Sequence, residues 1–244
     1  MQRATTLETL ADLAEDQWGL FTRRQAEAAG LAWTTISRLA RTGGAERLAH
    51  GVYRLRGGPP AEQLDLRAAW LQLAPELPAW ERGPDTGLVS HRSAAAVYGI
   101  GHLPADVHEF TLPKRRQSRR PDVRLHRGQT AKGWIRLRGL PVTVPSRIAA
   151  DLLAERDDSQ AVGQLIADAL RSKYDYPDSM AEAIAPYAAH FGLRRGHGLA
   201  LLGWLLELSG DPERSAWLAE AGISQRRISP DTLATSVGAR KPSR

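Results

Sequence analysis

Polar and basic side chains recur on one face of the segment between Trp33 and Gly43, and their types suit hydrogen bonding to bases and phosphates. An arginine can bond guanine O6 and N7 with both arms of its guanidinium, a contact worth ~1–3 kcal/mol of discrimination between bases. Hydroxyl groups near the amino end of a helix, beside free amide N–H groups, favour phosphate. The segment therefore predicts contacts to DNA from Thr34, Thr35, Ser37, Arg38 and Arg41.

The positions between those side chains are apolar. Ile36, Leu39 and Ala40 follow one another at i, i+3 and i+4, and Gly43 falls at i+7. This spacing predicts a helix that packs one face on its own domain. A helix reads the major groove only when its other face stays free and polar, which is the division found here.

A shorter helix is expected immediately before it. Thr22 and Gln25 match the reciprocal capping box S/T-x-x-Q, which satisfies two amide groups at a helix start. Gly30 ends this helix, because glycine adopts the left-handed conformation without a Cβ penalty. Arg23 and Arg24 then lie in the first turn, where contacts to phosphate are common, and we expect both to bind DNA.

The segment 47–57 has the pattern of a two-stranded hairpin. Gly51 suits a turn position with positive φ, and Val52 and Leu55 can face the core. Tyr53 either closes the small domain as a packing residue or contacts DNA. The basic side chains line an edge that could reach the minor groove or the backbone, which predicts DNA contacts from Arg47, Tyr53, Arg54 and Arg56.

These elements, with an amphipathic helix over 5–17, predict a winged helix-turn-helix domain at residues 1–57. A solvated helix face in an arginine-rich protein is the plain alternative. The three-helix order, the capping box, the glycine turn and the hairpin together favour the DNA-reading interpretation.

A second basic tract lies between Pro113 and Pro121. Ten of the residues from 113 to 138 are Lys or Arg and one, Asp122, is acidic. Dense cations attract phosphate and release counterions on binding. The alternative is a solvated loop. We expect the tract to extend the DNA footprint through Lys114, Arg115, Arg116, Arg119 and Arg120.

The bulk properties agree with a polyanionic partner. The chain has 244 residues and a net charge of +6, long enough for two modest domains. It has no cysteine, which fits a reducing bacterial cytoplasm. Neither a membrane span nor a signal peptide is expected, since no apolar run approaches the roughly 18 residues that a span needs.

The segment Gly57-Gly58-Pro59-Pro60 interrupts any helix or strand and marks a domain boundary. The rest of the chain predicts a domain of mixed helices and strands at 61–222. Short β-like runs at 107–112, 123–127, 134–138 and 141–144 predict one small antiparallel sheet. Helices are expected at 61–73 and 91–98, then at 145–155, 159–173, 178–190, 195–209 and 213–221. A disordered tail is expected at 223–244. The predicted fold class is α+β.

No enzymatic motif is present. The chain lacks a Gly-x-Ser-x-Gly elbow, a phosphate-binding P-loop and a Rossmann glycine pattern. Its seven histidines have no metal-ligand spacing. We expect no catalysis, no metal and no cofactor.

Three segments, at 51–55, 90–100 and 141–153, together resemble the AbiEi antitoxin family of type IV toxin–antitoxin systems. The first, Gly51-Val52-Tyr53-Arg54-Leu55, is similar to that family's wing. The second runs from Ser90 to Ile100, and the third, from Pro141 to Leu153, has Ile148 where the family usually has threonine. The physical interpretation of the last two is a scaffold: Ser90 caps a helix and Gly99 ends it.

The resemblance implies a DNA-binding antitoxin that represses its own operon at inverted repeats. It also implies neutralisation of a nucleotidyltransferase-like toxin without a tight complex. We expect the protein to be a monomer or weak dimer that binds DNA cooperatively. The alternative is a winged-helix regulator of another gene, whose second domain serves oligomerisation or ligand sensing.

Overall fold

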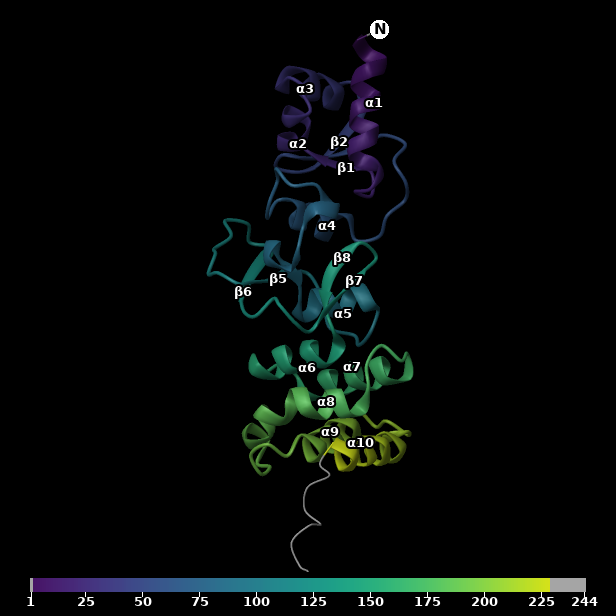
Figure 1. The fold of residues 1–244 in the computed structure, drawn as a ribbon, viewed down its shortest axis with the longest axis vertical. Coiled ribbons are helices and arrows are strands. Elements are labelled where there is room, and N and C mark those ends of the chain that lie inside the picture. Colours follow the sequence, from purple (N-terminus) through teal and green to yellow (C-terminus); the bar gives the residue numbers. More distant parts are fainter. Residues whose placement is uncertain (1, 229–244) are drawn as a thin grey trace, which may run out of the picture. The chain divides into compact units, whose positions relative to one another are not determined.

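The computed structural model describes residues 2–228 and divides the chain into two units. The first unit comprises Met1–Gly99 and Leu103–Val144, and the second comprises Ile100–His102 and Pro145–Arg244. The first unit begins with three helices and a small sheet (Figure 1). These elements are α1 (Gln2–Glu15), β1 (Leu20–Thr22), α2 (Arg23–Ala28), α3 (Trp33–Arg41), β2 (Ala45–Ala49) and β3 (Val52–Leu55).

This N-terminal part has a core of its own. The three strands form an antiparallel sheet in the order β1-β3-β2, so β3 is central. One buried cluster takes a side chain from every helix and every strand: Leu10, Phe21, Ala26, Ile36, Ala45 and Tyr53. A helix-turn-helix followed by a β-hairpin around one core is the arrangement predicted from the sequence.

The first unit continues with a helix, two 3₁₀ turns and a second sheet. The further elements are α4 (Leu64–Leu71), η1 (Ala79–Glu81), η2 (Pro84–Thr86), β4 (Leu88–Val89), α5 (His91–Tyr98), β5 (His108–Leu112), β6 (Val123–Arg127), β7 (Trp134–Leu137) and β8 (Leu140–Thr143). The predicted strands are found within a residue or two, and β4 was not expected.

The second sheet is mixed, which corrects the expectation of an antiparallel one. Its order is β6-β5-β4-β8-β7. β5 pairs with β6, and β4 with β8, in parallel, whereas β4–β5 and β7–β8 are antiparallel. β4, a two-residue strand from before α5, enters the centre of the sheet between β5 and β8 and gives one parallel pair, and the loop 113–122 that returns the chain to β6 gives the other. The α+β class is confirmed.

The N-terminal three-helix and hairpin part is bonded to the segment that follows it. Gln25 Nε2 donates to the Leu77 carbonyl at 2.8 Å, and the Ala79 amide donates to Gln17 Oε1 at 2.9 Å. Trp18 packs edge-on against Trp70 of α4. The sequence predicted a domain boundary between 57 and 61, whereas these contacts hold residues on both sides of it in one unit.

Arg82 fixes the carboxyl end of α4. Its side chain is buried, and its guanidinium donates to the carbonyl oxygens of Trp70, Leu71 and Ala74, with the Trp70 bond at 2.6 Å. Cationic groups suit this end of a helix, where carbonyl groups lack partners. Burial lowers the pKa of Arg82 to about 10, so the side chain stays charged at neutral pH.

The second unit is helical, and its helices pack on one another (Figure 1). They are α6 (Pro145–Ala154), α7 (Ser159–Arg171), α8 (Pro177–Ile184), η3 (Ala185–Phe191), α9 (Gly198–Leu208) and α10 (Arg214–Ile228). The helix expected over 178–190 is divided into α8 and η3. Pro186 explains the division, because it lacks the amide that would continue the α-helical bonds.

Helix α10 runs to Ile228, so residues 223–228 are helical where the sequence predicted a disordered tail. The rest of that tail, 229–244, lies outside the described residues. Within residues 2–228, no helix combines the length and the apolar character that a membrane crossing requires.

Candidate nucleic-acid interface

The start and end of α2 are built as the sequence predicted. Thr22 Oγ1 accepts from the Gln25 amide at 3.1 Å, and Gln25 Oε1 accepts from the Thr22 amide at 2.9 Å. Gly30 has φ +86°, and the Leu31 amide returns to the Ala26 carbonyl at 2.9 Å. This closed turn determines where the next helix, α3, can begin.

Helix α3 divides into an inner and an outer face. Ile36 is fully buried, and Leu39 and Ala40 are half-buried against the same core. Thr34, Ser37, Arg38 and Arg41 are exposed, and Thr35 is half-buried. All five predicted contact residues of α3 thus have accessible surface. By helical spacing Thr34, Arg38 and Arg41 lie opposite Ile36, and Thr35 and Ser37 lie on the two flanks.

The amino end of α3 is open to an anion. Its first flanking residue, Ala32, has no side chain that could cap the helix, so amide groups of the first turn remain for an external acceptor. Thr34 and Thr35 lie in that turn. Further along, Arg38 shares a shallow cleft with Thr35 and with Leu7 of α1.

Arg23 and Arg24 occupy the first turn of α2 but differ in their surroundings. Arg23 Nε lies 2.6 Å from Glu27 Oε1, and the Arg23 guanidinium lies 4.5 Å from the ring centroid of Trp33. Arg24 is exposed. Arg24 is therefore the more available phosphate ligand, while Arg23 also connects α2 to the first residue of α3.

The basic residues of the hairpin gather in one groove. Arg47, Arg54 and Arg56 line a shallow surface depression of about 590 Å³ that reaches Gly43 at the end of α3. Glu46 lines the same groove and offsets part of its positive charge. Arg54 donates to the Pro59 carbonyl at 3.2 Å, and Arg47 to the Ala49 carbonyl at 3.4 Å.

Tyr53 is a core residue, and the expectation that it contacts DNA is wrong. Its side chain is 2 % exposed and stacks on Phe21 with ring centroids 5.6 Å apart. The Trp33 ring also lies against Tyr53, with ring centroids 6.3 Å apart. The packing alternative is the one found.

The basic loop connects two parallel neighbours, β5 and β6. Such a connection must bring the chain back from the end of one strand to the start of the next. Arg116 Nη1 donates to the Leu73 carbonyl at 2.7 Å, and Arg120 bonds both Asp122 and Gln72. These two arginines anchor the loop against the end of α4.

Lys114, Arg115 and Arg119 are exposed and extend from the anchored loop. Unlike Arg116 and Arg120, they make no bond to the end of α4 within the described residues, so we expect them to be the loop cations that bind an external anion. The structure also brings the loop and α2 together, because Arg23, Arg24 and residues 116–120 line one cavity of about 580 Å³. The sequence pattern did not indicate this convergence.

A buried polar cluster around Glu109 supports the second sheet. The Glu109 carboxylate accepts from the Arg92 amide at 3.0 Å and lies 3.2 Å from His126 Nε2. Ser93 Oγ accepts from the Glu109 amide at 2.9 Å. Glu109 therefore caps α5. Ser90, the expected cap, makes no cap bond to the helix backbone; its Oγ accepts from Thr111 and lies 3.0 Å from His91 Nδ1.

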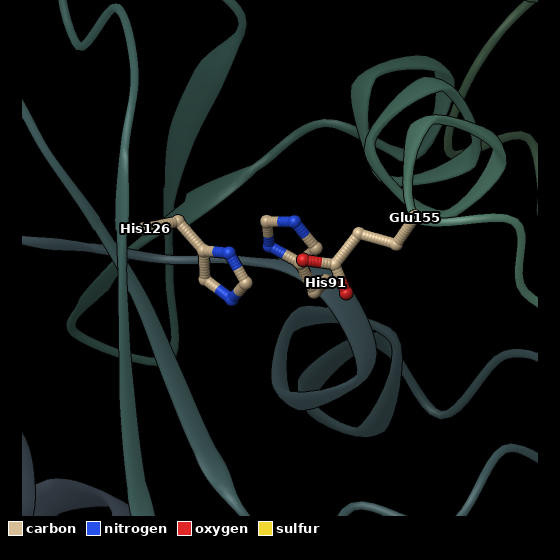
Figure 2. Close-up of side chains that lie close together, drawn as sticks. All are labelled: His91, His126 and Glu155. Atoms are coloured by element: carbon tan, nitrogen blue, oxygen red, sulfur yellow. The ribbon is translucent and has the colours of Figure 1, made fainter.

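The imidazole rings of His91 and His126 lie side by side in this cluster (Figure 2). Their ring centroids are 3.7 Å apart and their planes are within 14° of parallel. His91 has φ +52°, a left-handed conformation that a residue with a side chain adopts at a cost. No sequence spacing indicates this pair, because 34 positions separate the two residues and the sheet brings them together.

Sequence comparison finds a family for the N-terminal part. Residues 8–56 match the family described as "Transcriptional regulator, AbiEi antitoxin". The predicted resemblance is confirmed for this segment, which contains α2, α3 and the hairpin. The match ends before Ser90, so the likeness of the two downstream motifs stays a prediction. No curated protein matches the chain.

Proposed function

We propose that this protein is a DNA-binding antitoxin that represses its own operon through the winged helix. The observation that carries the proposal is the division of α3: Ile36 is buried in the domain core, while Ser37, Arg38 and Arg41 are exposed on one continuous surface. The match of residues 8–56 to a family of antitoxin transcriptional regulators supports it.

The proposed contacts have two kinds. Arg38 and its neighbours on α3 read base edges in the major groove. Arg24, the hairpin arginines and the exposed cations of the basic loop bind phosphates, which position the protein without reading sequence. Inverted repeats in the promoter would bind two copies of the protein, as monomers or a weak dimer.

The antitoxin half of the proposal rests on the family alone. We propose that the partner toxin has a nucleotidyltransferase fold and is neutralised without a tight complex. The alternative is a regulator of another gene whose second part senses a ligand. The cavity between α2 and the basic loop is the observation that favours this alternative.

DNA binding is tested with the promoter upstream of the chain's own gene. The affinity of the purified protein should fall steeply with salt concentration. Arg38→Ala should cost ~1–3 kcal/mol of binding free energy and relax the base preference at one position. Arg127→Ala, which removes an exposed arginine of β6, is the matched control. An Arg38→Ala protein with the affinity and base preference of the wild type would contradict the assignment of α3.

The toxin is tested separately. We expect a nucleotidyltransferase-like toxin, encoded beside this chain, to arrest growth when it is expressed alone. Coexpression of this chain with that toxin should restore growth. Failure to restore growth, with DNA binding intact, would favour the plain regulator.

A further inference from the structure

The first unit contains a cavity that the proposed DNA contacts do not explain. It has a volume of about 580 Å³, within the range of about 300–1,000 Å³ found for small-molecule sites. On one side lie the start of α2 and the hairpin turn at His50 and Gly51. On the other lie the end of α4, strand β6 and the basic loop.

The floor of this cavity is apolar. Val52 and Ala69 are buried, and Leu73 is nearly so. Val123 and Leu125 are half-buried and lie two residues apart on β6, so both side chains point to the same face of the sheet. A phosphate of the DNA backbone gains nothing from such a surface, because phosphate prefers water or hydrogen-bond donors.

The rim of the cavity carries five arginines and one carboxylate, Glu27, so its net charge is positive. Arg23 and Arg24 lie on one side, and Arg116, Arg119 and Arg120 lie on the other. Arg116 and Arg120 are held in place by Leu73 and Asp122, so the rim does not have to be ordered when a ligand arrives. Guanidinium groups bind carboxylate, phosphate and sulfonate through paired charge-assisted hydrogen bonds.

We propose that this cavity binds a small organic anion, with an apolar body on the floor and one acidic group at the arginine rim, and that binding weakens the affinity for DNA. We expect DNA affinity to fall, and not to rise, because the ligand carries the same negative charge as DNA. The ligand and the DNA phosphates compete for Arg24 and Arg119, which serve both surfaces.

Arg23 provides the structural route from the cavity to the DNA-reading helix. It lines the cavity, pairs with Glu27 and covers the Trp33 ring at the first residue of α3. An anion that draws the Arg23 guanidinium from Trp33 removes a contact that holds the start of α3. This coupling rests on the proposed DNA binding, whereas ligand binding does not.

Ligand binding is tested on the full chain without DNA, with 8-anilinonaphthalene-1-sulfonate as the probe and its fluorescence as the readout. We expect saturable binding of one probe per chain. The neutral analogue N-phenyl-1-naphthylamine should bind about tenfold more weakly, because it cannot pair with the rim. Inorganic phosphate should compete poorly, since it has no apolar body.

Two variants, each with a matched control variant, locate the bound probe. Val123→Phe fills the floor from the edge strand β6 and should weaken binding about tenfold. Ile135→Phe, the matched control, adds the same ring at an exposed position of the other edge strand, β7, and should bind like the wild type. Arg119→Ala should weaken binding several-fold, and Arg127→Ala should not. If circular dichroism shows that Val123→Phe does not fold, the comparison of Arg119→Ala with Arg127→Ala tests the location of the probe.

The effect on DNA is measured at constant ionic strength with saturating probe. A several-fold loss of promoter affinity, absent in Val123→Phe, supports the coupling, and DNA should lower the affinity for the probe by the same factor. Probe binding that does not change DNA affinity would leave a ligand site without a regulatory role and overturn the coupling. Absence of saturable probe binding, with Arg119→Ala still weakening DNA binding, would make the cavity a phosphate-binding cleft and overturn the whole inference.

Discussion

The guanidinium of Arg23 lies over the indole ring of Trp33, 4.5 Å from its centroid. Arg23 is the first residue of α2 and Trp33 is the first residue of α3. The contact thus joins the starts of the two helices that make up the helix-turn-helix. Trp33 also lies near Tyr53 of the hairpin, so the ring of Trp33 connects α3 to both α2 and β3.

Trp33→Leu should lower the free energy of unfolding by about 1 kcal/mol, because it removes an exposed cation–π contact and part of the packing on Tyr53. DNA affinity should fall more than stability does, since the start of α3 loses its contact with α2. Urea unfolding and promoter binding measure the two effects.

Trp80→Leu is the matched control for this substitution. Trp80 is 50 % exposed in η1, away from α2 and α3 in the sequence. We expect little change in either measurement. Equal losses of DNA affinity in the two variants would argue against a positioning role for Trp33.

The five cations of the basic loop should separate into two classes. Replacing Lys114, Arg115 and Arg119 by alanine should weaken binding to all DNA sequences alike and lower the salt slope by up to about 3, near one unit for each lost phosphate contact. Arg116→Ala with Arg120→Ala should mainly destabilise the loop, because these residues bond Leu73 and Asp122. A loss confined to one operator sequence would mean that the loop reads bases.

The N-terminal fold was predictable because its signals are local. The capping box at Thr22 and Gln25 spans four residues, and the glycine turn at Gly30 depends on one backbone conformation. The polarity of α3 appears at helical spacing. Each of these features is decided by neighbours in the sequence.

Features that depend on distant residues were not predictable in the same way. The sequence leaves Tyr53 open between packing and DNA contact, and its burial follows from the Phe21 and Trp33 rings that pack against it. Glu109 replaces Ser90 as the cap of α5 only because β5 lies beside that helix. The basic loop looks free in the sequence, yet two of its arginines are bound to the end of α4. In each case tertiary contact overrides a local preference.

The capping box should make a measurable contribution to stability. Thr22→Ala removes the acceptor for the Gln25 amide and also the hydroxyl that donates to the Pro75 carbonyl. We expect the free energy of unfolding, measured with urea, to fall by about 1–2 kcal/mol. This is the upper end of the range for helix caps, because Thr22 is fully buried. Thr42→Ala, an exposed threonine at the end of α3, should change stability by less than about 0.5 kcal/mol.

Glu109 should make stability depend on acid pH. Burial by itself raises the pKa of Glu109, but the hydrogen bond with His126, the nearby His91 and the Arg92 amide outweigh burial and hold the pKa below 4.5. Arg124 also lies 3.5 Å from this carboxylate. A carboxyl group with a lowered folded-state pKa stabilises the fold above the pKa of the unfolded chain, and this stability is lost as pH falls through the folded-state value.

Glu109→Gln tests whether the charge of Glu109 stabilises the fold at neutral pH and ceases to do so in acid. The variant keeps the size of the side chain but loses the charge, so at neutral pH it should be less stable than the wild type by about 2 kcal/mol, the value of a hydrogen bond to a charged group. The difference should stay constant above about pH 5 and shrink as pH falls below 4.5, because protonation then removes the same charge from the wild type. Urea unfolding of both proteins at a series of pH values measures it. A difference that persists unchanged at low pH would mean that Glu109 supports the sheet through shape alone.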